Sequence, residues 1–76
     1  GELVKISETL YFSAGPLERL QEEMVVFIKQ EGEIDAPRFK TLSGLTRKFS
    51  IPILEYFDRI KLTIRVGDCR KLRGQG

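Results

Sequence analysis

The sequence predicts one small α+β domain in which three helices precede a C-terminal β-hairpin. A chain of 76 residues suits a single domain and leaves no room for a second. Apolar residues recur at helical spacing in the segment 13–61. Two β-prone runs, 62–66 and 69–73, flank Gly67-Asp68, a pair typical of hairpin turns. We therefore expect helices over 13–61 and a hairpin over 62–73, within one domain spanning 1–76.

Two short β-prone runs precede the helices, LVKI at 3–6 and TLYF at 9–12. They predict a hairpin or two edge strands. Two origins stay open for residues 1–12: they begin this domain, or they are a remnant shared with a preceding domain. The chain begins with Gly-Glu-Leu rather than Met, which we take to indicate an excised fragment.

The first predicted helix begins at Pro16, where the missing N–H of proline costs nothing, with Ser13 or Gly15 as its cap. Gly32 is the expected stop. One apolar face follows the i, i+3, i+7 spacing and is expected to be buried. Its residues are Leu17, Leu20, Met24, Phe27 and Ile28.

Asp35 is the expected cap of a short second helix, which Ser43-Gly44 ends after about two turns. A third helix begins between Thr46 and Ser50 and runs to about Ile60. A start near Ser50 would put Pro52 in the first turn and leave the preceding cations on the connecting loop.

A short helix joined to a longer one by a tight glycine turn is a helix-turn-helix, and a hairpin after it is a wing. The predicted fold is therefore a winged helix. The register of the wing stays open. A two-residue turn would put Ile64 and Leu72 on opposite faces, whereas a three-residue loop would place them together, which burial favours.

Positive and negative charge are divided between the two halves of the chain. Residues 1–37 carry three basic and eight acidic side chains, a net charge of −5, whereas residues 38–76 carry ten and three, a net charge of +7. This division indicates that a polyanion meets the C-terminal half. The alternative is two ordinary solvated surfaces.

The positions of the charged residues on the third helix indicate which shape of polyanion would fit. Its apolar stripe of Phe49, Ile53, Tyr56, Phe57 and Ile60 defines the core face, and Arg47, Lys48, Glu55 and Asp58 lie off it. A ligand lying along the helix would meet the two acids, whereas one that contacts only the first turn avoids them. The helix dipole and unpaired N–H groups add to the cations there. We therefore expect a compact anionic protrusion rather than a long duplex, the alternative being a solvated turn.

Other cations are weaker candidates. Lys40 ends the second helix near this point, and Arg65 and Arg70 belong to the wing, where a solvated strand face is an equal alternative. Cys69 lies beside two cations, which could lower its pKa and make it reactive, but we expect a structural role.

The composition argues against an enzyme. The chain has no His and a single Cys, so it lacks an imidazole base, a His-ligated zinc site, a CxxC site and an internal disulfide. No Gly-rich phosphate loop precedes a helix. We expect no cofactor, no membrane segment and a cytoplasmic location.

The stretch TRKFSIPILEYFDR (46–59), followed by T-x-R-x-G-D-x-R-x-L (63–72), resembles the C-terminal winged-helix domain of the bacterial selenocysteine-specific translation elongation factors (SelB), and LYFS (10–13) agrees. The resemblance covers nearly the whole chain. It implies a domain that binds the apical loop of an mRNA hairpin, the selenocysteine insertion element, and tethers the factor to the message. The GTP site would belong to an N-terminal portion absent here.

The resemblance implies Arg47 and Lys48 as primary RNA contacts, with Lys40, Arg65 and Arg70 as secondary ones. The expected partners are an mRNA stem-loop and a preceding winged-helix domain of the same factor, and we expect a monomer. Two alternatives stay open: a winged-helix DNA-binding domain of a transcription regulator, and a winged helix that binds protein.

Overall fold

The computed structural model describes residues 2–74. Three helices and five short strands form in the order β1-β2-α1-β3-α2-α3-β4-β5. The helices are α1 (Ala14–Glu31), α2 (Ala36–Ser43) and α3 (Arg47–Arg59). The strands are β1 (Leu3–Lys5), β2 (Tyr11–Ser13), β3 (Ile34–Asp35), β4 (Thr63–Val66) and β5 (Cys69–Leu72). The predicted α+β winged-helix fold is confirmed.

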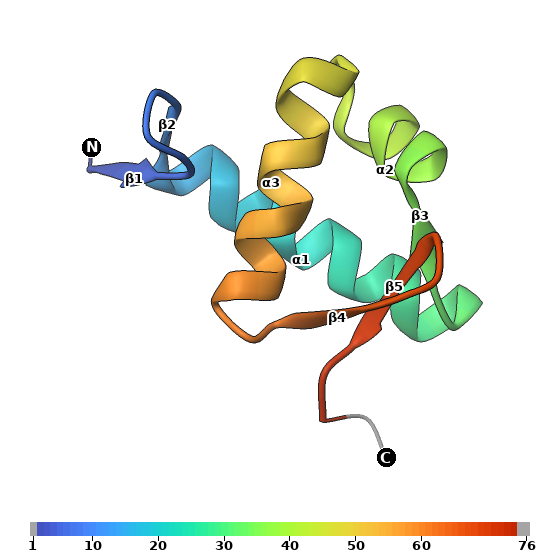
Figure 1. Cartoon of the computed structure of the whole chain (residues 1–76). Coiled ribbons are helices and arrows are strands. Elements are labelled where there is room, and N and C mark those ends of the chain that lie inside the picture. The colour runs from blue at the N-terminus through green and yellow to red at the C-terminus, as the bar shows by residue number, and fades with distance from the viewer. Residues whose placement is uncertain (1, 75–76) are drawn as a thin grey trace.

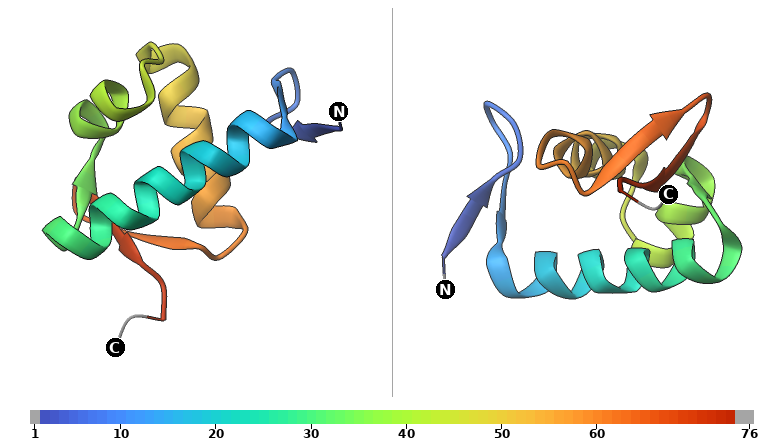
Figure 2. Two further views of the ribbon diagram at one scale, coloured as in Figure 1. Left: turned by 180° about the vertical axis from the view of Figure 1, so that it is seen from behind. Right: turned by 90° about the horizontal axis from the view of Figure 1, so that it is seen from below.

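The elements form two layers. Helix α1 runs along one side, and α3 crosses it on the other side together with the β4–β5 wing (Figures 1 and 2). The β1–β2 hairpin stands at the start of α1, and β3 and α2 follow its far end. Strand β3 pairs with β5, so the wing belongs to a three-stranded antiparallel sheet in the order β3-β5-β4.

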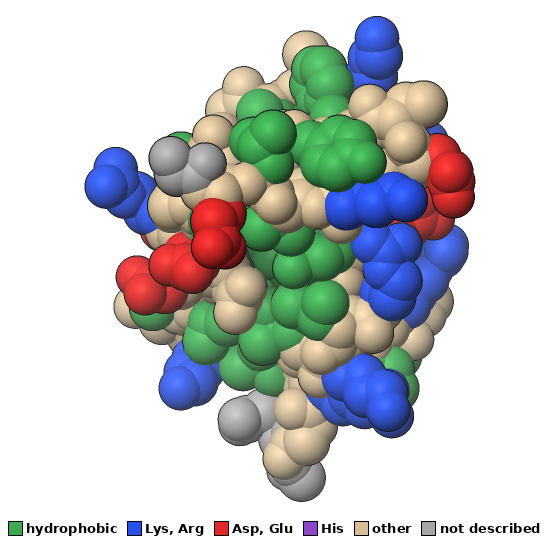
Figure 3. All heavy atoms as spheres, turned by 90° about the vertical axis from the view of Figure 1, so that its left-hand side faces the viewer, with side chains coloured by type: hydrophobic (Ala, Val, Ile, Leu, Met, Phe, Trp, Pro, Cys, Tyr) green, Lys and Arg blue, Asp and Glu red, His purple; other side chains and the backbone are tan. Residues whose placement is uncertain are grey.

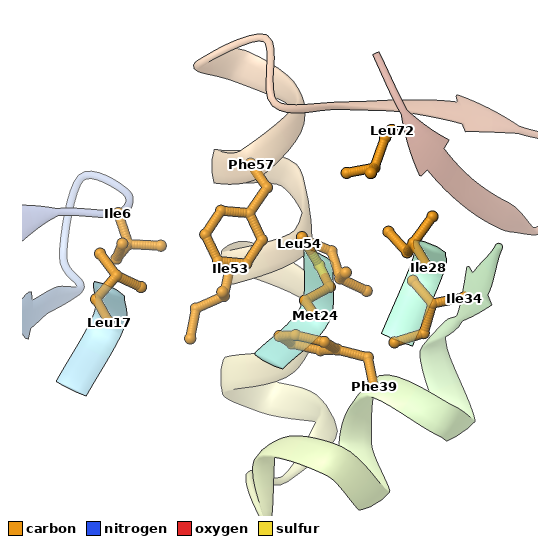
Figure 4. Packing of buried hydrophobic residues seen from close by; sticks show 10 residues of the cluster. All are labelled: Ile6, Leu17, Met24, Ile28, Ile34, Phe39, Ile53, Leu54, Phe57 and Leu72. Carbon is orange, nitrogen blue, oxygen red and sulfur yellow. The ribbon is translucent and has the colours of Figure 1, made fainter. Parts of the chain in front are cut away.

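The core fills the space between α1 and α3. Figure 4 shows Phe57 and Ile53 lying between the pair Ile6 and Leu17 on one side and a larger apolar group on the other. Phe39 packs edge-to-face on Phe57 with their ring centroids 6.3 Å apart. All three helices and the strands β3 and β5 contribute buried apolar side chains to one core. Its buried apolar members are Ile6, Leu17, Met24, Ile28, Ile34, Phe39, Ile53, Leu54, Phe57 and Leu72.

Helix α1 begins at Ala14, two residues earlier than predicted, so Pro16 lies in its first turn. Ser13 is the N-cap by its extended backbone, although its side chain makes no capping hydrogen bond. Gly32 ends the helix as predicted, with φ +92° and its N–H donating to the Ile28 carbonyl at 2.6 Å. Among residues 2–74, no helix has the length and apolar content needed to cross a bilayer.

Helix α2 is capped as predicted, because the Asp35 carboxylate accepts a hydrogen bond from the Arg38 N–H at 2.9 Å. Helix α3 then begins at Arg47, at the early end of the predicted range. The conditional reading that placed Pro52 in the first turn and the cations on a loop is therefore wrong. Pro52 is the sixth residue of α3, and the two cations are its first residues.

The buried side of α3 also differs from the predicted stripe. Ser50 and Leu54 are fully buried, whereas Ile60 is 43% exposed just past the helix end. Leu54 belongs to the same core as Met24 of α1 (Figure 4), and both are 0% exposed, so burial is centred nearer Leu54 than the apolar spacing alone indicates. Ser50 takes a buried position because its hydroxyl donates to the Leu45 carbonyl at 3.3 Å.

The wing uses the two-residue turn, so the preference for a three-residue loop was wrong. Val66 pairs with Cys69 and Thr63 pairs with Leu72, which turns Ile64 outward, where it is 44% exposed. Thr63 is only 1% exposed and takes the inner position because its hydroxyl donates to Asp58 at 2.6 Å. Gly67 has φ +63°, as a hairpin turn with glycine first requires.

The N-terminal residues form the predicted hairpin, with Val4 opposite Phe12. Its connecting segment delivers Ile6 into the core at 1% exposure. The Arg59 guanidinium of α3 donates to the Ile6 carbonyl at 2.7 Å. These contacts tie the hairpin to α1 and α3.

Candidate nucleic-acid interface

The first turn of α3 presents two cations and backbone N–H groups at one point. Arg47 and Lys48 are its first residues, and both are exposed. Thr46 is the N-cap, and its carbonyl accepts from Phe49 and Ser50 at 3.1 and 2.9 Å. The N–H groups before these have no acceptor within the helix, and the helix dipole adds positive potential.

The turn between α2 and α3 holds that point beside the end of α2. Gly44 has φ +72°, and its N–H donates to the Lys40 carbonyl at 2.9 Å. The Ser43 hydroxyl accepts from the Leu45 N–H at 3.1 Å. Lys40 is thereby brought to a shallow hollow of about 500 Å³ next to the start of α3. The hollow is lined by Pro37, Lys40, Thr41, Gly44, Leu45 and Thr46.

A larger groove of about 780 Å³ lies between α2, α3 and the wing, elements that border one side of the molecule in Figure 1. We call it the α2–α3–wing groove. Four of the five predicted RNA contacts line it, and its apolar surface includes Ile51. The lining residues are Asp35, Ala36, Pro37, Lys40, Arg47, Ser50, Ile51, Glu55, Arg65, Asp68 and Arg70.

Lys48 is the predicted contact that does not line the groove. Its ammonium nitrogen lies 5.7 Å from the centre of the Phe49 ring. Phe49 in turn packs edge-to-face on Phe12 of the N-terminal hairpin, with centroids 6.3 Å apart. Successive helical residues point about 100° apart. Arg47 and Lys48 therefore serve two different sides of the same helix terminus.

Arg70 is the predicted contact with the least accessible side chain. Only 8% of that side chain is exposed, and its Nε and Nη2 both donate to Asp58 Oδ2, at 3.3 and 3.1 Å. Asp58, which the sequence placed off the core face with Glu55, is therefore engaged in an ion pair that was not predicted. Asp58 is bound at the base of the wing, and direct RNA contact by Arg70 stays a prediction.

The charges that remain accessible in the groove are arranged by position along α3. Lys40 and Arg47 lie near the first turn of α3. Arg65 lies exposed on the wing, where its Nε donates to the Gly67 carbonyl at 3.0 Å. Glu55 lies about 12 Å further along the helix axis than Arg47. A ligand confined to the first turn of α3 therefore meets Lys40 and Arg47 and lies short of Glu55, while Asp35 and Asp68 are the other acids that line the groove.

Cys69 faces acids rather than the neighbouring cations. Its thiol lies 3.2 Å from Glu33 Oε2. This hydrogen bond raises the pKa of Cys69, and partial burial and the charges of Glu33, Asp35 and Asp68 raise it further. The reactive thiol considered from the sequence is therefore not supported. Within residues 2–74, no group of three metal-ligating side chains converges.

The sequence model of the family "Elongation factor SelB, winged helix" matches residues 26–72. The chain belongs to this family. It is 38% identical over 73 residues to a selenocysteine-specific elongation factor of Desulfomicrobium baculatum, a match that covers 96% of the chain and 12% of that factor. The resemblance inferred from the sequence is confirmed.

The solved mRNA-binding domain of elongation factor SelB from E. coli, in complex with SECIS RNA, is similar to the chain with a TM-score of 0.83. The two are 35% identical, and the match covers 93% of the chain and 59% of that domain. The chain therefore spans about an eighth of the Desulfomicrobium factor and somewhat more than half of the solved E. coli domain.

In this SelB-family domain, reasoning from sequence found the cations of the groove and missed how they are divided. Glu55 lines the groove, in keeping with its predicted place off the core face. The pairing of Asp58 with Arg70 was missed, because it depends on the wing register. The residue types around Asp58 and Arg70 carry no signal of that register.

Proposed function

We propose that this chain binds the apical loop of an mRNA hairpin, the selenocysteine insertion element, and tethers a selenocysteine-specific elongation factor to its message. The cations clustered at the start of α3 carry this proposal. They surround a short terminus rather than a long helix face, which suits a compact RNA tip. Loop bases can be splayed out and read, unlike the deep major groove of A-form RNA.

Family membership supports the RNA target. The similar E. coli SelB domain was solved with SECIS RNA. The matched relatives are translation factors, which disfavours a transcription regulator that binds duplex DNA.

The cations take different roles in this proposal. Arg47 and Lys48 bind phosphates or base edges on two sides of the tip, and Lys40 adds positive charge from the end of α2. Arg65 contacts the RNA from the wing. Arg70, whose charge is already paired, contributes least directly. Phosphate contacts would supply most of the affinity and the loop bases the selectivity.

The proposal covers a non-enzymatic module without a cofactor. The absence of His from the sequence supports this, since the commonest general base is missing. GTP would be bound by another part of the full-length factor. A preceding winged-helix domain of that factor is the expected protein neighbour, and we propose a cytoplasmic monomer.

The test is a titration of the chain against three nucleic acids across a range of salt concentrations. They are a hairpin with a selenocysteine insertion element, the same stem without its loop, and duplex DNA. We expect preference for the intact hairpin. Four phosphate contacts would give a slope of about −3 for log affinity against log salt. Equal binding to all three would contradict loop recognition, and tightest binding to duplex DNA would favour the regulator.

A further inference from the structure

Asp58 binds both strands of the wing. Its Oδ1 accepts a hydrogen bond from Thr63 of β4 at 2.6 Å, and its Oδ2 accepts two from Arg70 of β5. Thr63 and Arg70 are 1% and 6% exposed, so these bonds lie at the buried base of the wing. A single carboxylate near the end of α3 therefore joins both strands of the hairpin to the helix, beside the core contact of Leu72 and the pairing of β5 with β3.

The pairing register of the wing places two positive charges side by side, one of which is the Arg70 that Asp58 binds. Arg70 lies directly opposite Arg65 on the same face of the wing. Like charges in that position destabilise a pair of strands. Asp58 neutralises the charge of Arg70 and keeps its side chain buried, whereas Arg65 remains exposed along the groove. The two arginines look alike in the sequence but differ in the structure: Arg70 forms a buried ion pair, and Arg65 is free to contact a ligand.

We propose that Asp58 is a positioning residue for RNA binding: it anchors Arg70 and so presents Arg65 to the RNA from the wing. The proposal rests on the proposed function. It predicts an effect opposite in sign to simple electrostatics. Removal of an acid near a polyanion should strengthen binding by electrostatics alone. Removal of Asp58 instead leaves Arg70 unpaired opposite Arg65, so that the two arginines repel each other and the wing loses its bond to α3. Arg65 is then no longer held in position, and binding weakens.

The primary variant is Asp58→Asn, and its matched control is Glu55→Gln, which removes the same charge one turn earlier on α3 from a side chain that lines the groove. The probe is a synthetic RNA hairpin with a selenocysteine insertion element, titrated against the 76-residue chain at a temperature where circular dichroism shows each variant folded. We expect Asp58→Asn to weaken binding at least about fivefold, as the loss of one positioned contact does. Glu55→Gln should leave affinity unchanged or raise it.

A double-mutant cycle separates positioning from loss of stability. In an Arg65→Ala background, Asp58→Asn should weaken binding by less than about twofold, because the contact that it positions is already gone. In a Lys48→Ala background it should keep its full effect. Asp58→Asn should also reduce the salt slope by about 0.7–0.9, as Arg65→Ala does. A smaller folded fraction alone would change neither the slope nor the difference between backgrounds.

A second variant covers the case in which Asp58→Asn does not fold. Arg70→Lys keeps the charge but loses the two-donor contact with Asp58. We expect it to weaken binding about threefold or more and to reduce the salt slope as Arg65→Ala does. Unchanged affinity in Arg70→Lys, stronger binding in Asp58→Asn, or equal effects in both backgrounds would overturn the proposal. If the unmodified chain fails to prefer the hairpin, the proposed function fails instead.

Discussion

Arg47 combines three properties expected of an RNA contact. It is the first residue of α3, it is exposed, and it lines the α2–α3–wing groove. We expect Arg47→Ala to cost about 1–3 kcal/mol of RNA-binding free energy, because it removes a cation that the helix dipole reinforces. The measurement is the affinity for the hairpin at fixed salt.

Arg38 is the matched control for this prediction. It is also an exposed arginine near a helix start, but it lines neither the hollow nor the groove, and it lies 4.0 Å from Asp35. Arg38→Ala should change affinity by less than about 0.5 kcal/mol, as expected of an exposed ion pair. Equal losses for Arg38→Ala and Arg47→Ala would indicate general attraction rather than a site at α3.

Cys69 gives a prediction that depends on pH. Its hydrogen bond to Glu33 raises the thiol pKa, so less thiolate is present at a given pH and alkylation is slower than for a free cysteine. Glu33→Gln removes the negative charge, which should lower the pKa toward its ordinary value. The alkylation profile with iodoacetamide should then shift to lower pH. Glu31→Gln, which alters an acid outside this contact, should leave the profile in place, and coincident profiles for all three proteins would contradict the assignment.

At the scale of elements, α3 contains an internal weakness. Pro52 is its sixth residue and has no N–H to donate to the Lys48 carbonyl one turn earlier. An interior proline costs about 3 kcal/mol relative to alanine, partly offset by about 1 kcal/mol because it stiffens the unfolded chain. We expect Pro52→Ala to stabilise the domain by about 1–2 kcal/mol, measured by urea unfolding.

Pro37 is the control, because it lies in the first turn of α2, where the missing N–H has no intrahelical acceptor. Pro37→Ala should be neutral or slightly destabilising. If both substitutions changed stability equally, the position of Pro52 within the helix would not explain its effect.

The wing shows where prediction from sequence ends. Its two strands and its glycine turn follow from local residue types, and both were predicted. Its register was not, because apolar spacing favoured burying Ile64, whereas the structure buries Thr63 beside Asp58. A polar residue takes a core position when another side chain satisfies it, and here that partner, Asp58, lies on the preceding helix, outside the alternating pattern of the strand. For the same reason, the ion pair between Arg70 and Asp58 was not predicted.

For the whole molecule, the division of charge along the chain becomes an uneven distribution of cations in space. Figure 3 shows acidic side chains on both edges of the face beside the hairpin, apolar surface between, and the largest group of Lys and Arg on the right-hand edge. This uneven distribution follows from the topology, because the acidic α1 lies in one layer and α3 with the wing in the other. Overall charge polarity was therefore predictable from sequence, while the allocation of each cation required the fold.

The N-terminal hairpin decides where the domain begins. If residues 1–12 belong to this domain, the core requires Ile6, which is 1% exposed and lies beside Leu17 (Figure 4). Ile6→Ala should then cost about 2–4 kcal/mol of unfolding free energy in urea, much of the stability of a domain this small. Leu3→Ala, in the same hairpin but 65% exposed, should cost less than about 0.5 kcal/mol. Equal, small effects would instead assign the hairpin to a preceding domain.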